Sequence, residues 1–329
     1  MATYKGIKGV KVVTKTADPT ALEAEGTVWY NSTSPTALKY AILSPTGSWA
    51  SVASLSTPKS QAAGFGIATA AIAAGGAAPG ILDTSETYDG STWTEGNNMN
   101  SSRRNARATG TVTAGMVVAG WGSPSGVTAT EYYDGTCWSV QGGTITRGGG
   151  NQSQAIAGAS QASALIFGGE PGTTYWKYTE EWNGTSWSEQ NNLLNGRQAP
   201  GGVGIVTAAL CIGGYSPGAV NYVEEYDGTS WSATGTDLNS ARAAMGASGT
   251  STACLAFGGS GVTDLTESFN GSTWTEVSDL ATARMEGGCA QTPTMTNASA
   301  LYIGGTPPLT DVVEEWAEPS YTIKTVTVS

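Results

Sequence analysis

The stretch EEYDGTSWSATGTDLNSAR, from Glu224 to Arg242, decides the fold of this chain. Its nineteen residues contain an acidic doublet, an aromatic residue, an Asp-Gly pair, a tryptophan and an arginine. Taken alone, these residue types could form a carboxylate active site, a sugar-binding platform or a structural hairpin. The number of times that the stretch recurs in the chain distinguishes these three interpretations, because a catalytic constellation normally occurs only once.

The stretch contains one copy of a repeated motif. The pattern E-x-[YWF]-[DN]-G-x-x-W occurs five times and ends at Trp93, Trp138, Trp187, Trp231 and Trp274. Successive tryptophans lie 45, 49, 44 and 43 residues apart, and a weaker copy, SPTGSW, ends at Trp49. A shortened last copy, EEWAEPS, begins at Glu314 and lacks the glycine and the second tryptophan. A fixed period of this length is the signature of a repeat architecture.

Other features follow the same period. An apolar run closed by small residues precedes each motif, as in ALCIGG at 209–214. One basic residue follows each tryptophan after nine to eleven positions: Lys59, Arg103, Arg147, Arg197, Arg242 and Arg284. The second copy has Arg104 and Arg107 in addition. The glutamates that open the motifs are Glu86, Glu131, Glu180, Glu224, Glu267 and Glu314. Each repeat therefore carries one glutamate and one basic residue.

Each repeat predicts four short strands. The first strand follows the basic residue, the second is the apolar run, the third carries the E-x-aromatic pattern, and the fourth begins at the tryptophan. The Asp-Gly and Asn-Gly pairs between the third and fourth strands favour type I′ hairpin turns, because these residues accept a positive φ. Four antiparallel strands in a repeat of about 45 residues are typical of a β-propeller blade.

The order of Gly-Gly, aromatic residue, tryptophan and arginine resembles the kelch repeat. The resemblance covers residues 44–319, but this chain lacks the proline and longer turn that often stand between the tyrosine and the tryptophan in kelch repeats. It implies an all-β, six-bladed kelch-like β-propeller. Five blades are complete in sequence, and the sixth lacks its fourth strand. We therefore expect Gly47–Leu55 to complete that blade beside Val312–Trp316, which would leave the ring without a free edge.

The repeated residues are expected to build the blades. Tryptophan side chains bury a large area, so we expect them between neighbouring blades. Each repeated glutamate lies two positions before an aromatic residue and shares its strand face. A buried carboxylate needs a partner, and the basic residue of the repeat is the candidate, which predicts a ring of Glu–Arg pairs. Adjacent strand residues point to opposite faces, so a doublet such as Glu224-Glu225 could not present two carboxylates to one sugar.

Composition narrows the functional classes. Charged residues make up 12% of the chain and 46 of its 329 residues are glycine, which favours strands and turns over helices. The net charge of −11 argues against nucleic-acid binding. A basic arm with Lys5, Lys8, Lys11 and Lys15 could dock on an acidic partner or protect a strand edge. No apolar run has the length of a membrane span or of a signal-peptide core, so we expect no membrane insertion and no signal peptide.

The residues needed for common catalytic sites are missing. The chain has no histidine, which excludes histidine-based triads and histidine metal sites. Its four cysteines form no C-x-x-C pair. We therefore expect no metal, no cofactor and no enzyme activity. An acid–base carboxylate enzyme is the remaining catalytic alternative.

Function is expected where the blades differ. The connections between the second and third strands vary most, and they carry the aromatic residues Trp121, Tyr175, Trp176 and Tyr215. Aromatic residues on the loops of a rigid scaffold suit stacking on a glycan or contact with a protein partner. The alternative is that they only cover blade edges.

The two ends of the chain lie outside the repeats. Residues 1–43 predict a β-hairpin in EGTVWYNSTSPTALKYAI, and residues 320–329 alternate like a β-strand, so the two segments could pair into a small sheet. Such a hairpin resembles N-terminal segments of tailed-phage fibre and other virion structural proteins. The whole chain is similar to kelch-like structural proteins of marine tailed phages.

This resemblance implies a non-enzymatic virion structural protein of the tail-fibre or decoration type, made in the host cytoplasm. Residues 1–43 and 320–329 would bind other virion proteins, and the propeller would contact a host-surface glycan or receptor. A role of this kind implies a symmetric assembly. A secreted or surface glycan-binding, lectin-like propeller is the first alternative, and a carboxylate glycosidase is the second.

Overall fold

The computed structural model of this chain describes residues 13–18, 28–33, 37–43, 47–146, 154–170, 174–290, 299–318 and 321–326. The regular elements in these ranges are β-strands, and no helix occurs among the described residues. The all-β class expected from the sequence is therefore confirmed. The chain divides into a larger compact unit, Ser48–Ala317, and a smaller one that combines Met1–Gly47 with Glu318–Ser329.

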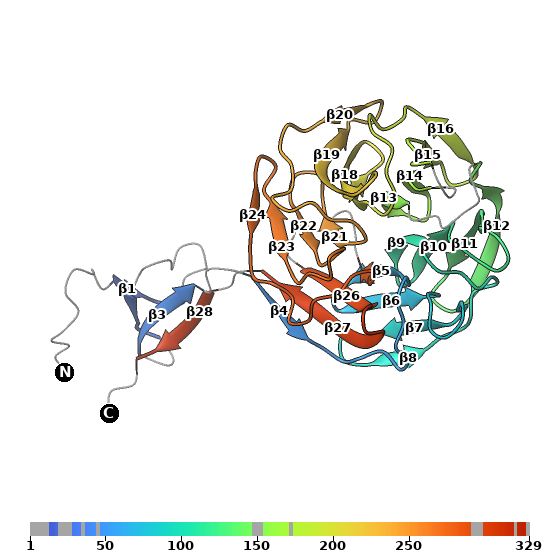
Figure 1. Cartoon of the computed structure of the whole chain (residues 1–329). Helices are drawn as coiled ribbons and strands as arrows, with labels where there is room; N and C mark the ends of the chain where they lie inside the picture. The colour runs from blue at the N-terminus through green and yellow to red at the C-terminus, as the bar shows by residue number, and fades with distance from the viewer. Residues whose placement is uncertain are drawn as a thin grey trace. The chain divides into compact units, whose positions relative to one another are not determined.

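The larger unit contains six four-stranded antiparallel sheets, five of which take four successive strands (Figure 1). The first sheet contains β5 (Ala63–Ile67), β6 (Ala70–Ala74), β7 (Ser85–Tyr88) and β8 (Trp93–Glu95). The second contains β9 (Arg107–Thr111), β10 (Ala114–Val118), β11 (Ala129–Tyr133) and β12 (Trp138–Thr144). The third contains β13 (Ala155–Ser160), β14 (Ser163–Phe167), β15 (Thr179–Trp182) and β16 (Trp187–Gln190). The fourth contains β17 (Gly201–Ile205), β18 (Ala208–Tyr215), β19 (Ala219–Tyr226) and β20 (Trp231–Ala233). The fifth contains β21 (Gly246–Gly249), β22 (Cys254–Phe257), β23 (Thr266–Phe269) and β24 (Trp274–Glu276).

The sixth sheet takes its strands from both ends of the larger unit. It contains β25 (Gly288–Ala290), β26 (Ser299–Gly305), β27 (Thr310–Ala317) and β4 (Ser48–Ser51). β4 pairs antiparallel with β27 in a register that places Trp49 opposite Trp316. The segment expected at residues 47–55 therefore supplies the fourth strand, although its regular part is only four residues long.

The sheets are arranged around a common centre (Figure 1). The first strand of each sheet contacts the first strand of the next, in the order β5, β9, β13, β17, β21 and β25, and β25 contacts β5 again. The inner strands approach closely because their residues are small. A Cβ on Gly64 would lie only 2.6 Å from the carbonyl oxygen of Cys289 in β25. This arrangement is consistent with a β-propeller.

The turn between the third and fourth strands differs from the expected type. Tyr226 pairs with Trp231, so the loop comprises the four residues 227–230. Gly228 has a φ of +92°, but Asp227 is not in the left-handed region. The Asp227 side chain instead accepts two backbone N–H groups of the loop, both at 2.8 Å. The expected type I′ turn is therefore wrong, because the aspartate holds a longer loop through its side chain.

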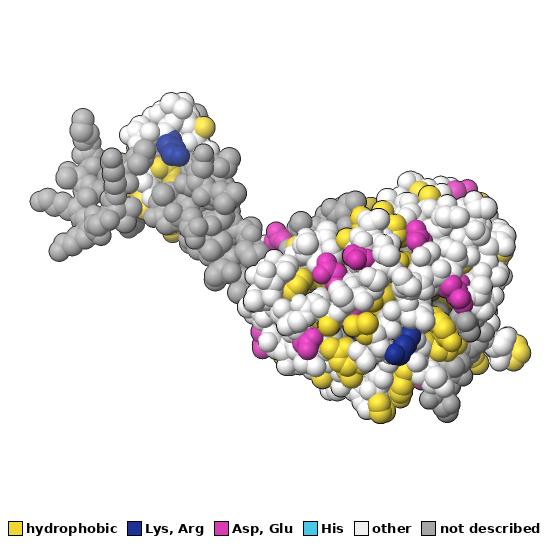
Figure 2. All heavy atoms as spheres, turned by 90° about the horizontal axis from the view of Figure 1, so that it is seen from above, with side chains coloured by type: hydrophobic (Ala, Val, Ile, Leu, Met, Phe, Trp, Pro, Cys, Tyr) yellow, Lys and Arg dark blue, Asp and Glu magenta, His cyan; other side chains and the backbone are white. Residues whose placement is uncertain are grey.

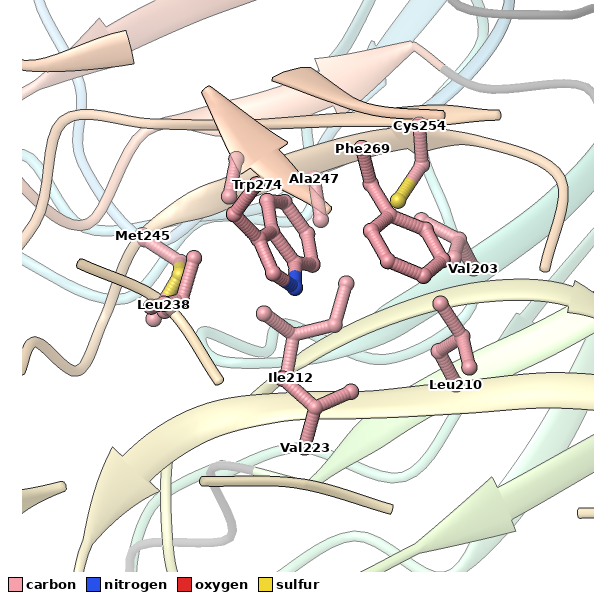
Figure 3. Close-up of a cluster of buried hydrophobic side chains, with 11 residues drawn as sticks. Val203, Leu210, Ile212, Val223, Leu238, Met245, Ala247, Cys254, Phe269 and Trp274 are labelled. Atoms are coloured by element: carbon pink, nitrogen blue, oxygen red, sulfur yellow. The ribbon is translucent and has the colours of Figure 1, made fainter. Parts of the chain in front are cut away.

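The hydrophobic core is divided among the interfaces between neighbouring sheets. Six buried clusters occur in the described residues, and each joins one sheet to the next. In the cluster of Figure 3, Ile212 and Val223 of the fourth sheet project toward Phe269 and Trp274 of the fifth. A cluster of the same kind joins the sixth sheet to the first. Each sheet is thus stabilised on both faces by its neighbours.

The repeated tryptophans belong to these interfaces, as expected. Burial of about 200 Å² of tryptophan surface contributes up to about 5 kcal/mol per residue. The Nε1 of Trp187 in the third sheet also donates a hydrogen bond to Oγ1 of Thr130 in the second, at 2.9 Å. Equivalent bonds join two other pairs of neighbouring sheets, from Trp49 to Thr266 and from Trp231 to Thr179. Among the described residues the Nε1 of Trp274 has no hydrogen-bond partner, because Val223 stands at the position that is a threonine in those sheets.

The smaller unit contains one four-stranded sheet. Its strands, in spatial order, are β1 (Val13–Lys15), β2 (Val28–Asn31), β3 (Ala37–Leu43) and β28 (Tyr321–Thr325). β2 and β3 form the expected hairpin, and β28 pairs antiparallel with β3, so both chain ends contribute to the sheet. Asp18 accepts hydrogen bonds from Trp29, Asn31 and Lys39. The Lys39 ammonium, the largest contribution, and these amide and indole donors lower the pKa of Asp18. Lys5, Lys8 and Lys11 of the basic arm lie outside the described residues.

Candidate functional site

The repeated glutamates and basic residues form buried ion pairs. Five pairs lie within the described residues: Lys59–Glu86, Arg103–Glu131, Arg197–Glu224, Arg242–Glu267 and Arg284–Glu314. No side chain in them is more than 4% exposed. Arg147 lies outside the described residues, and the glutamate of its repeat, Glu180, accepts the N–H of Thr146 at 2.9 Å. Each pair joins the third strand of a sheet to the segment that leads into its first strand.

Glu224 shows how these carboxylates are used. One oxygen lies 3.1 Å from Nη1 of Arg197. The backbone N–H groups of Leu194 and Asn195 donate to the carboxylate at 2.7 and 3.2 Å. The Glu224 carboxylate therefore holds the segment that connects the third sheet to the fourth. Glu225, the other half of the doublet, is exposed, so the doublet is divided between the interior and the surface.

A cavity of about 250 Å³ lies among the first strands of the six sheets. Its width depends on one position of each first strand, namely the residue that pairs with the last apolar residue of the second strand. In five sheets that residue is small: Ala63, Ala155, Gly201, Gly246 and Gly288. In the second sheet the equivalent residue is Arg107. The first strands thus leave a central space, and Arg107 is the one cation among the described residues that line it.

A ring of left-handed residues lines the cavity. The residue two positions after the basic residue has a positive φ in five repeats: Gln61, Asn105, Ala199, Ala244 and Glu286. Backbone hydrogen bonds of 2.6 to 3.0 Å link these residues between neighbouring sheets, including Gln61 N–H to the Glu286 carbonyl and Asn105 N–H to the Gln61 carbonyl. Residues other than glycine seldom adopt this conformation, so the surrounding bonds must hold it in place. All five residues line the cavity.

Arg107 and Glu286 are the two charged side chains among the described residues that line the cavity. The Nε of Arg107 donates to the backbone carbonyl of Gln154, and the described residues give its Nη atoms no partner. The Glu286 carboxylate accepts a hydrogen bond from Nε2 of Gln61 at 2.8 Å. Burial lowers the pKa of Arg107, and attraction to Cys289 and Glu286 opposes this. Arginine is a cation at neutral pH even so, and the cavity holds one positive and one negative group.

The structure brings two of the four predicted loop aromatics together. Tyr215 is 39% exposed and lines the cavity, and its ring centroid lies 5.9 Å from that of Tyr175. Trp176 is half-buried and packs edge-on against a neighbouring tyrosine. Trp121 is also half-buried, and its backbone exchanges two hydrogen bonds with Arg104. Of the four residues, only Tyr215 is in the described lining of the cavity, and ligand binding by any of them stays a prediction.

Arg107 and Glu286 were not among the residues predicted to bind a ligand. Their signal in the sequence is a departure from the repeat. Arg107 replaces a small residue, and Glu286 stands where the other described repeats have glutamine, asparagine or alanine. The sequence alone does not show that these two exceptions to the repeat belong together, because Arg107 and Glu286 are far apart in the chain. They come together only when the sheets are arranged around one centre.

The surface of the larger unit has no dense cluster of charge in the view of Figure 2, where acidic side chains are scattered over a mostly uncharged face. Over the described ranges, no three or more cysteine, aspartate or glutamate side chains are grouped as metal ligands.

In the part of the chain that the structure describes, no helix is long and apolar enough to cross a membrane.

No family model matches the sequence, and no curated protein matches it.

Proposed function

We propose that the larger unit is a six-bladed kelch-like β-propeller, closed by β4, and that the chain is a non-enzymatic structural protein of a tailed-phage virion. In this proposal the smaller unit attaches the protein to the particle. The propeller presents the face with the cavity and Tyr215 to the host surface or to another virion protein.

The observation that carries the proposal is the separate sheet built from both chain ends. β1 to β3 and β28 form a compact unit of their own, while β4 to β27 form another. Attachment and presentation can therefore be divided between two independently built parts, as a fibre or decoration protein requires.

The use of the repeated carboxylates supports a non-enzymatic role. A retaining or inverting glycosidase needs two carboxyl groups on either side of one sugar bond. The glutamates of the five ion pairs are instead buried and bonded to arginine or lysine, and each lies in a different sheet. We therefore do not propose a glycosidase.

The proposal is tested by mass spectrometry of purified phage particles, in which peptides of this chain are expected. A second measurement uses Trp29→Ala, which removes a buried side chain of β2 and should disrupt the smaller sheet. We expect this variant to fold its larger unit but to be absent from particles. The control is Val140→Ala, at an exposed site of β12. Absence of the wild-type chain from particles would refute the proposal.

A glycan-binding propeller without a virion role is the second candidate. The pair of Tyr175 and Tyr215 favours it, because exposed aromatic rings stack on sugars. A glycan array with the wild-type chain and Tyr215→Ala tests this candidate. Binding that is lost in the variant, together with absence from particles, would favour it over the virion protein.

A further inference from the structure

We infer that the central cavity binds an acidic monosaccharide, with the carboxylate on Arg107 and the hydroxyl groups on Glu286 and the neighbouring amides. The inference deepens the proposed contact with surface glycans and rests on it for the choice of a sugar acid. The site itself lies within the larger unit and does not depend on assembly into a particle.

The carboxylate is assigned to Arg107. The guanidinium is held at one nitrogen by the backbone carbonyl of Gln154. The described residues leave its two Nη atoms unpartnered, and these form a planar fork that matches a carboxylate. Arg107 is the only cation among the described residues that line the cavity, so an anionic group has one place to bind.

The remainder of the ligand is assigned from the other polar groups. Glu286 accepts a hydrogen bond from Gln61 at one oxygen, and the described residues give its other oxygen no partner, so that oxygen can accept a hydroxyl group. Asn105 and Gln198 line the cavity with neutral amides, and such groups both donate to and accept from hydroxyls. Tyr215 adds an aromatic face at the edge. Neutral amides, one carboxylate acceptor and an aromatic ring are suited to a polyhydroxylated ring more than to a second charge.

The size of the cavity agrees with a single sugar. Pockets for drug-sized ligands have volumes of about 300–1,000 Å³, and this cavity has about 250 Å³. A longer saccharide would have to extend past Tyr215 toward solvent. The Glu286 carboxylate should also reject a second negative charge on the ligand, because like charges in a shared cavity repel.

The test is isothermal titration of the purified full chain with D-glucuronate, D-glucose and 2-O-sulfo-D-glucuronate, which carry one, no and two anionic groups on the same pyranose ring. We expect glucuronate to bind at least about tenfold more tightly than the other two. Arg107→Gln should weaken glucuronate binding by about tenfold to a hundredfold and leave glucose unchanged. Lys177→Gln, which removes an exposed charge outside the cavity lining, is the matched control and should bind like the wild type.

Glu286→Gln should increase affinity for 2-O-sulfo-D-glucuronate by about tenfold, and a misfolded protein could not show this gain. Thermal unfolding of each variant identifies any that fails to fold. Absence of glucuronate binding by the wild type, equal affinity for glucose and glucuronate, or wild-type binding by a folded Arg107→Gln protein would each overturn the inference. Particle composition is measured separately, so a failure here leaves the proposed virion role intact.

Discussion

The glutamate doublet of the repeat offers a matched pair of substitutions. Glu224→Gln and Glu225→Gln make the same chemical change at adjacent positions, one buried and one exposed. We expect Glu224→Gln to lower the free energy of unfolding by about 3 kcal/mol. We expect Glu225→Gln to change it by less than about 0.5 kcal/mol.

The magnitude follows from the contacts of Glu224. Loss of one partner of a buried ion pair costs about 3–5 kcal/mol, because the other charge stays buried. Arg197 is fully buried and cannot lose its proton, so it must remain as an unpaired cation. Two features hold the cost to the lower end of this range. The new amide oxygen can still accept the N–H of Leu194, and the Tyr222 ring lies 4.5 Å from the guanidinium carbon.

Urea unfolding followed by tryptophan fluorescence measures the effect, since the chain contains eleven tryptophans. With a denaturant slope of about 3 kcal/mol/M, the midpoint of Glu224→Gln should fall by about 1 M while the slope stays constant. Equal midpoints for the two variants would refute the reasoning. Replacement of both partners in Glu224→Gln/Arg197→Met should restore much of the loss, because no charge then remains buried. A double variant less stable than Glu224→Gln would contradict the role assigned to the unpaired arginine.

Three further predictions follow from single features of the larger unit. Val223→Thr should raise the melting temperature and increase the free energy of unfolding by about 1 kcal/mol, because the threonine hydroxyl can accept a hydrogen bond from the Nε1 of Trp274. A lower melting temperature would contradict this. The backbone N–H groups of Ser230 and its neighbour lower the pKa of Asp227 below its usual 3.8. The stability that these hydrogen bonds contribute is therefore present above pH 3.8 and is lost as the pH falls through the lower folded-state pKa. A titration of the Asp227 carboxyl carbon followed by carbon-detected NMR should give a midpoint under pH 3.8. Val262 is 37% exposed and has a φ of +53°, a conformation that asparagine tolerates better than valine. Val262→Asn should therefore increase the free energy of unfolding, measured in urea, by about 1 kcal/mol. No increase would mean that the valine is not strained in this loop.

The strands could be predicted from the sequence because their determinants are local and repeated. Alternation in the E-x-aromatic pattern, the apolar runs and the tryptophan positions each indicate one strand, and five copies reinforce one another. The pairing of β4 with β27 could also be predicted, because an incomplete last repeat and an orphan segment near the front complement each other. The turn type could not, because Asp-Gly is compatible with several loop lengths, and the pairing of Tyr226 with Trp231 selects a longer one.

The cavity could not be predicted, because it depends on how six inner strands are placed. Arg107 lies in the second sheet and Glu286 lies in the segment that leads into the sixth, and no local sequence pattern relates them. The expectation that the loop aromatics bind a ligand stays a prediction. Tyr215 lines the cavity, whereas the backbone of Trp121 is bonded to Arg104 and its side chain is half-buried. A loop aromatic serves equally well as a ligand platform or as packing, and the sequence does not distinguish the two.

The pairing of β4 with β27 has a consequence for synthesis on the ribosome. β4 is the first strand of the larger unit to emerge, and β27 is the last. At about 5–20 residues per second, roughly 10 to 50 seconds separate the two, and the nascent chain must keep β4 unpaired throughout. During this interval the apolar surfaces that later join the sixth sheet to the first remain uncovered. Completion of the sixth sheet must therefore wait for the synthesis of β27, and a product terminated before β27 would leave β4 as an unpaired strand that is prone to aggregation.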